Sequence, residues 1–180
     1  MAWVIVGLGN PGDEFEGTRH NTGRMAVEDF ARTAKLSEWR GDKKSKSLVS
    51  RGLIGKTLVA LVLPNTFMNK SGLAVSKFVK SAKSAERLAV VYDDLDLPLG
   101  SMKISFNRGS GGHKGIESIM RAIKTKAFVR LRVGISKTTP KGKLKKPVGD
   151  EAVGDFILGT FKKDELEILK KLAKRAGEAF

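Results

Sequence analysis

The chain has 180 residues, enough for a single domain with a proper hydrophobic core. It contains no cysteine, which excludes disulfides, thiolate zinc sites, iron–sulfur clusters and a cysteine nucleophile. Its formal net charge of +15 favours a polyanionic partner.

The apolar pattern predicts strands that alternate with helices. In chain order we expect a strand at 3–8, a helix at 22–36, a hairpin of strands 48–54 and 56–63, a helix at 71–81, strands at 88–92 and 102–106, a helix at 113–126, a strand at 129–135 and a helix at 163–176. This order indicates an α/β fold, a mixed, mostly parallel twisted sheet sandwiched between helices. No linker or repeat divides the chain, so we expect residues 1–180 to form one globular domain.

Positive charge is concentrated in one segment. Ten lysines and arginines lie between Arg121 and Pro147, with no acidic residue among them. Such a run repels itself unless a polyanion binds it, and nucleic acid is the partner we expect. No stretch approaches the ~20 apolar residues of a membrane span, and the N-terminus lacks signal-peptide features. We therefore expect a cytoplasmic protein without a membrane partner.

The only two histidines are His20 and His113, and both lie in polar, glycine-punctuated segments. Histidine exchanges a proton near neutral pH, and loop histidines beside glycines are frequent at functional sites. Their surroundings do not match a familiar zinc spacing, so we expect no catalytic metal and no cofactor.

Two glycine motifs offer competing hypotheses. The segment from Gly7 to Gly12 matches G-x-G-x-x-G after a strand, the fingerprint of a dinucleotide-dependent oxidoreductase. Against it, Pro11 and ten further loop-like residues precede the first helical pattern, whereas the fingerprint needs a helix that starts at once. The segment from Gly52 to Thr57 is two residues too short for a P-loop and is expected to be part of the hairpin.

The remaining polar residues favour hydrolysis by an activated water. A base at His20 needs a carboxylate to orient it, and Asp93 directly follows a buried strand, where open α/β sheets place their sites. Asn10 and Asn69 are candidates to position water or to donate to an oxyanion, and turn formation is the alternative role for both.

Six segments in order resemble the bacterial-type peptidyl-tRNA hydrolase family. They cover nearly the full length, and residues 155–159 resemble the family's tail. The segments are Gly7–Gly12, Thr18–Asn21, Pro64–Gly72, Asp93–Gly100, Gly109–Gly115 and Arg130–Ile135. The resemblance implies hydrolysis of the ester between a peptide and the 3′-terminal ribose of tRNA, by a monomeric, metal-free α/β enzyme. The expected partner is thus peptidyl-tRNA.

The resemblance also implies roles for individual residues. By matching position, His20 is the general base, Asp93 supports it and Asn10 distinguishes peptidyl-tRNA from aminoacyl-tRNA. The residues matched to substrate or tRNA binding are Phe15, Phe67, Asn69, His113, Lys114, Lys103 and Arg132. Further phosphate contacts are expected from Arg130 and residues 141–146, which hold tRNA without selecting a sequence.

Two residues depart from the family pattern. Lys114 stands where the family commonly has Asn, which replaces a donor and acceptor by a charged donor. Phe15 stands where Tyr is common, so a phenolic hydrogen bond is lost. The alternatives to an active hydrolase are a non-catalytic tRNA-binding relative, which Lys114 would mark, and the oxidoreductase.

Overall fold

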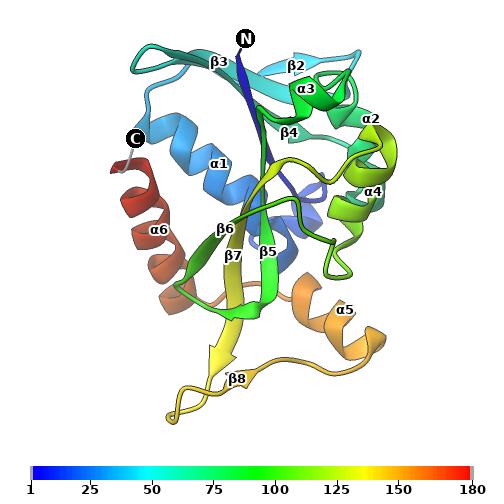
Figure 1. Ribbon diagram of the computed structural model, residues 1–180. Helices are drawn as coiled ribbons and strands as arrows, with labels where there is room; N and C mark the ends of the chain where they lie inside the picture. The colour runs from blue at the N-terminus through cyan, green and yellow to red at the C-terminus, as the bar shows by residue number, and fades with distance from the viewer. Residues whose placement is uncertain (1, 179–180) are drawn as a thin grey trace.

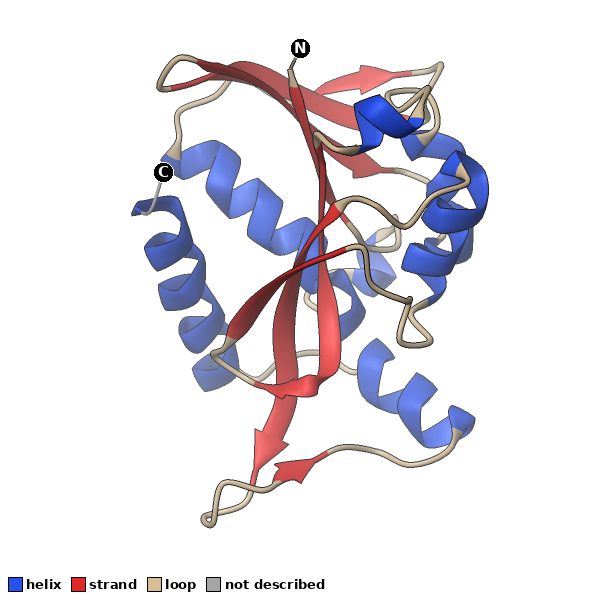
Figure 2. Ribbon diagram, viewed as in Figure 1, coloured by secondary structure: helices blue, strands red, loops and turns tan. Residues whose placement is uncertain are grey.

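The computed structural model describes residues 2–178, which form eight strands in one mixed sheet flanked by helices (Figures 1 and 2). The sheet order is β2-β3-β4-β1-β5-β7-β6, with β8 paired to the end of β7. Strands β4, β1, β5 and β7 run parallel, and the outer pairs are antiparallel. The expected α/β sandwich with a mixed sheet is therefore confirmed.

The strands include the predicted apolar runs, but β5 and β7 continue beyond the ends expected at 92 and 135. Their bounds are β1 Trp3–Gly7, β2 Arg40–Asp42, β3 Ser47–Ile54, β4 Thr57–Pro64, β5 Leu88–Pro98, β6 Met102–Phe106, β7 Val129–Thr138 and β8 Leu144–Lys145. Gly55 adopts φ 57° in the turn between β3 and β4, as the hairpin prediction required. The short strands β2 and β8 were not predicted.

The helices pack on both faces of the sheet. Their bounds are α1 Thr22–Thr33, α2 Ser71–Val75, α3 Ala82–Ala85, α4 Lys114–Ile123, α5 Asp150–Leu158 and α6 Lys163–Glu178, and three 3₁₀ turns are η1 Asp13–Phe15, η2 Arg19–Asn21 and η3 Met68–Lys70. Figure 1 shows α1 and α6 on one face, α2 and α4 on the other, and α5 near β8.

Each face of the sheet has its own apolar core. On the α2–α4 face, Val75 and Ile119 pack against Val6 and Val90 of the central strands. On the α1–α6 face, Val27 and Leu169 pack against sheet residues such as Leu61. Because β1 and the buried part of β5, residues 88–93, are covered on both sides, the residues at their ends are held rigidly.

Three expected helices differ in length from the prediction. Helix α1 ends at Thr33 because Lys35 turns into the left-handed region, φ 50°, and Leu36 N–H donates to the Ala31 carbonyl in a Schellman arrangement. The helix expected at 71–81 is α2, followed by turns and the separate α3. The helix expected to 126 ends at Ile123, since Lys124 is left-handed, φ 55°. Within residues 2–178, no helix is long and apolar enough to cross a membrane.

Candidate active site

Polar side chains converge where β1 ends, where α1 and α4 begin, and at Asp93 in the middle of β5. Close packing of two glycines brings these segments together. A side chain on Gly23 would place its Cβ 2.1 Å from the Val91 carbonyl of β5, and one on Gly7 would meet the Gly23 carbonyl at 2.6 Å. The first turn of α1 therefore lies directly on β5, and the η2 turn before it is held beside Asp93.

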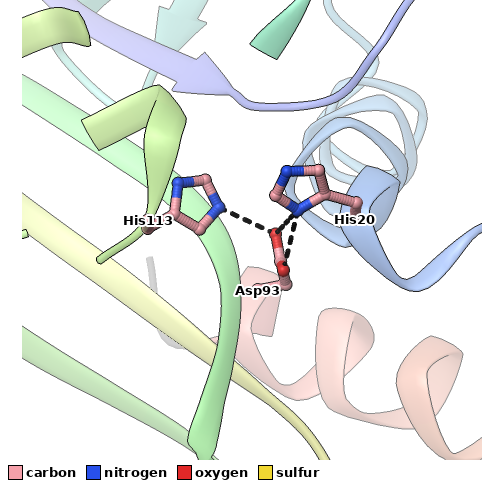
Figure 3. Close-up of side chains that lie close together, drawn as sticks. All are labelled: His20, Asp93 and His113. Atoms are coloured by element: carbon pink, nitrogen blue, oxygen red, sulfur yellow. Dashed lines mark hydrogen bonds and ion pairs between the residues drawn. The ribbon is translucent and has the colours of Figure 1, made fainter. Parts of the chain in front are cut away.

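His20, Asp93 and His113 form one hydrogen-bonded cluster (Figure 3). His20 Nδ1 lies 3.1 Å and 3.0 Å from the two carboxylate oxygens of Asp93. His113 Nε2 lies 3.0 Å from Asp93 Oδ1 on the other side. Asp93 is only 4% exposed and His20 7%. The structure thus brings the predicted pair into contact and adds the second histidine to it.

The charges of the cluster stabilise one another. Burial alone would raise the pKa of Asp93, but the two imidazoles and their hydrogen bonds hold the pKa of this carboxyl far below its usual range. Burial would lower the pKa of His20, and the Asp93 carboxylate with its hydrogen bond outweighs that effect, so the pKa of His20 is raised. Because an ionised carboxylate can only accept, His20 Nδ1 carries the hydrogen and Nε2 is the basic nitrogen.

Asn10 is fixed by hydrogen bonds that leave its amide nitrogen as a donor. Its backbone N–H donates to Asn21 Oδ1 at 2.8 Å, and Asn21 Nδ2 donates back to the Asn10 carbonyl at 2.9 Å. Asn10 Oδ1 accepts the Met68 N–H at 2.8 Å, which fixes the orientation of the amide. The Nδ2 group is then the polar end left for a ligand.

A groove of about 480 Å³ opens beside this cluster, and His20 and Asn10 form part of its wall. The other lining residues are Phe67, Met68, Asn69, Lys70, Lys114, Gly154, Ile157 and Leu158. The lining combines apolar side chains with amides and two lysines, and no carboxylate of the described residues belongs to it. The groove therefore suits a ligand that combines an acylated, partly apolar group with an anionic group.

Comparison with known proteins agrees with the geometry. A family model described as Peptidyl-tRNA hydrolase matches residues 4–180. The chain belongs to the peptidyl-tRNA hydrolase family. The peptidyl-tRNA hydrolase of Carboxydothermus hydrogenoformans is 42% identical over 178 residues, which are 98% of this chain and 89% of the relative. That of Aquifex aeolicus is 41% identical over 175 residues, 96% of this chain and 85% of the relative.

A solved member of the peptidyl-tRNA hydrolase family has the same fold. The crystal structure of the Acinetobacter baumannii enzyme superposes with a TM-score of 0.86 at 33% identity, covering 98% of this chain and 85% of that one. The resemblance inferred from the six sequence segments is therefore confirmed.

The dinucleotide alternative does not fit this family or this fold. After Gly7 the chain continues through η1 and η2, and the first α-helix begins only at Thr22. The glycine loop consequently does not place a helix N-terminus against a pyrophosphate, as the fingerprint requires. In this hydrolase fold, Gly7 serves close packing against α1 instead.

Three of the seven residues predicted to bind substrate or tRNA line the groove, namely Phe67, Asn69 and Lys114. Phe67 and Asn69 are exposed in its wall, and Phe15 packs edge-on against Phe67 with ring centroids 6.2 Å apart. Lys114 reaches the groove from the first turn of α4, where its ammonium lies 3.8 Å from Glu117. His113, matched to substrate binding in the sequence, points instead into the buried cluster.

Lys103 and Arg132 lie outside the groove, opposite each other on β6 and β7. Lys103 is exposed, whereas Arg132 is buried and its Nε donates to Asp94 at 2.5 Å. The expectation that Arg130 contacts phosphate is wrong. Its side chain is fully buried, stacked on Phe128 and bonded to the Gly109 carbonyl. Counting charges in sequence does not separate a buried arginine from a surface one.

The sequence did not indicate a role for Arg19, which connects the η2 turn to two helices. Its guanidinium lies over the rings of Phe156 and Phe161, at 4.6 Å and 5.2 Å, and pairs with Glu165 at 3.1 Å. Arg19 thus ties η2 to α5, which forms one wall of the groove, and to α6. The only signal in the sequence is its position beside His20, which does not identify its partners.

Proposed function

We propose that His20, Asp93 and Asn10 carry out ester hydrolysis on peptidyl-tRNA at this groove. The observation that carries the proposal is the contact between His20 Nδ1 and the buried Asp93 carboxylate, which leaves the other ring nitrogen, Nε2, as the base of a residue that lines the groove. A groove without carboxylates and with two lysines supports an anionic, acylated substrate. Membership in the family supports peptidyl-tRNA as that substrate.

In the proposed reaction, His20 Nε2 removes a proton from a water molecule, which attacks the carbonyl carbon of the ester. Asp93 stabilises the imidazolium that forms. His20 then returns the proton to the 3′ oxygen of the ribose as the carbon–oxygen bond breaks. The products are the free peptide acid and tRNA. General-base assistance of this kind contributes about 10²–10⁴-fold in rate.

Asn10 is proposed to act through its amide nitrogen. Because Oδ1 is occupied by the Met68 N–H, Nδ2 can donate to a carbonyl oxygen of the substrate. The acylated amino group of peptidyl-tRNA carries an amide carbonyl that can accept this hydrogen bond. The free ammonium group of aminoacyl-tRNA can only donate. The fixed orientation of this amide therefore supports discrimination in favour of peptidyl-tRNA.

The tRNA body is proposed to lie along the exposed lysines of the basic segment, at 141–146. Lys141, Lys143, Lys145 and Lys146 are exposed there, and the Lys146 ammonium lies 2.6 Å from the Asp96 carboxylate. Lys103 supplies a further exposed cation on β6. Such side chains bind phosphates without reading bases, as an enzyme acting on many tRNAs requires.

All proposed groups come from one chain, so we infer that the enzyme acts as a monomer. Because peptidyl-tRNA arises in translation, we infer that it acts in the cytoplasm. Neither inference is needed for the chemistry of the site.

The test is release of tRNA from an N-acetylated aminoacyl-tRNA, with an unblocked aminoacyl-tRNA as control substrate. His20→Ala should lower kcat by about 10²–10⁴-fold while tRNA affinity is retained. A His20→Ala enzyme as fast as wild type would refute the mechanism. Wild-type protein that binds tRNA but leaves the ester intact would instead identify a non-catalytic relative.

A further inference from the structure

We propose that the N-terminus of α4 fixes His113 as the tautomer with hydrogen on Nε2, which makes His113 an obligate donor to Asp93. The inference rests on the proposed function, because it assigns His113 a positioning role for the His20 base. It replaces the substrate-binding role that its sequence position suggested.

The first step concerns the nitrogen that faces α4. His113 is the N-cap of this ten-residue helix, and its Nδ1 accepts the N–H groups of Gly115 and Ile116, at 3.2 Å and 3.4 Å. These are among the amides at the start of a helix that have no partner within it. A ring nitrogen that accepts two N–H groups presents its lone pair and carries no hydrogen. In a neutral ring, the hydrogen is then on Nε2.

The second step concerns the nitrogen that faces β5. Nε2 lies 3.0 Å from Asp93 Oδ1, so its hydrogen points at the carboxylate. Asp93 is held between this donor and His20 Nδ1, and its backbone is fixed in the β5–β7 pairing opposite Val133. His113 therefore limits the orientations of the carboxylate, and the carboxylate in turn selects the His20 tautomer with a basic Nε2.

The same tautomer makes the cluster unsuitable for a transition metal. His20 Nδ1, an Asp93 oxygen and His113 Nε2 lie within 4.8 Å of one another, and two histidines with a carboxylate are a common zinc ligand set. A neutral histidine bound to metal through Nε2 carries its hydrogen on Nδ1 and donates it to an acceptor. Here that hydrogen would point at two N–H donors. The donor pattern fits protons and not a metal.

Two substitutions separate capping from positioning. His113→Ala removes both the N-cap acceptor and the donor to Asp93. His113→Asn keeps an acceptor for the first amides of α4, since Asn is a favoured N-cap, but its shorter side chain does not reach Asp93. A hydrogen bond to a charged group justifies an expected fall in kcat of roughly tenfold to a hundredfold in both variants, with KM little changed. His113→Asn should retain the thermal stability that His113→Ala loses.

The direct measurement is nitrogen-15 NMR of the two imidazoles in the intact protein. Wild-type His113 should show hydrogen on Nε2 and a lone pair on Nδ1, and neutral His20 should show hydrogen on Nδ1. In His113→Asn, the His20 signals should move towards a mixture of tautomers. Added zinc chloride at one equivalent should leave both wild-type rings unshifted.

Three results would overturn the inference. They are hydrogen on Nδ1 of His113, wild-type kcat in His113→Asn, and a joint shift of both rings at one equivalent of zinc. The proposed function fails separately, through an active His20→Ala enzyme. An inactive His20→Ala with an unaffected His113→Asn would therefore reject only the positioning role.

Discussion

Replacement of Asp93 by Asn tests the cluster most directly, because it removes the charge and keeps the shape. His113 Nε2–H would donate to an amide oxygen in the place of Oδ1, which leaves the NH₂ group in the place of Oδ2, the carboxylate oxygen 3.0 Å from His20 Nδ1. A donor at that place requires Nδ1 to accept, so the hydrogen of neutral His20 moves to Nε2. The groove then presents an N–H where the reaction needs a base.

The expected cost in kcat is large. The same inversion of tautomer in a serine-protease triad lowers kcat about 10⁴-fold, and we expect 10³–10⁴-fold, roughly, for Asp93→Asn. KM should change little, because the buried carboxylate does not line the groove. Single-turnover hydrolysis of N-acetyl-aminoacyl-tRNA measures the effect. Asp96→Asn is the matched control, since Asp96 is exposed and its change should leave kcat unaltered.

The pH profile gives a second readout with a definite sign. In the wild type, activity should rise through the pKa of His20, which the Asp93 carboxylate raises above 6.5. In Asp93→Asn, burial still disfavours the imidazolium but the carboxylate no longer offsets it. The rise of activity with pH should therefore occur at lower pH in Asp93→Asn than in the wild type, although the maximal rate of the variant is lower. An acid limb that stays in place or moves upward would refute this account of the cluster, as would a wild-type kcat.

The same pair should make stability depend on pH. The raised pKa of His20 contributes stability that is fully present below its unfolded value of 6.5 and is lost as pH rises through the folded pKa. The depressed pKa of Asp93 contributes stability present above its ordinary value of 3.8. Asp93→Asn should thus reduce the free energy of unfolding most between pH 3.8 and 6.5, measured by urea denaturation. A difference that grows above this window would contradict the assignment.

Three further predictions address the substrate and the scaffold. Asn10→Asp keeps the acceptor for the Met68 N–H but loses the donor, and kcat/KM on the N-acetylated substrate should fall about a hundredfold; an unchanged value would exclude the amide from substrate contact. Gly23→Ala should greatly lower the melting temperature, because its Cβ would overlap the Val91 carbonyl; normal melting would show that α1 can move away from β5. Neutralising Lys143, Lys145 and Lys146 together should weaken tRNA binding. The slope of log affinity against log salt concentration should fall by up to about two to three, and an unchanged slope would show that these exposed lysines do not contact tRNA.

The sequence was sufficient for the central sheet and for the main pair of the site. The strands β1 and β4 and the first part of β5, residues 88–92, are largely continuous apolar runs, and their burial on both faces explains why the pattern is clear. Asp93 was expected just after a buried strand. It lies within β5, which continues to Pro98, but it still lies where the carboxyl end of the buried run meets α1 and α4.

Helix α5 shows why the remainder could not be predicted from periodicity. None of the residues in Asp150–Leu158 is buried, so the helix has no core-facing stripe for an apolar pattern to reveal. It contacts η2 instead, and Arg19 lies against its Phe156 ring and carbonyl. Arg19 and Phe156 are 137 positions apart in the chain. A helix held mainly by such a distant arginine and by the η2 turn leaves no local pattern in the sequence.

His113 illustrates the same limit inside the site. The sequence placed it where a glycine loop meets a helix expected from residue 113, and the family resemblance assigned it to substrate binding. Its role depends on where the first amides of α4 point and on how near β5 lies, and both are set by packing across the α2–α4 face. Because those contacts decide which nitrogen carries the hydrogen, the protonation pattern of the active site depends on the fold as a whole.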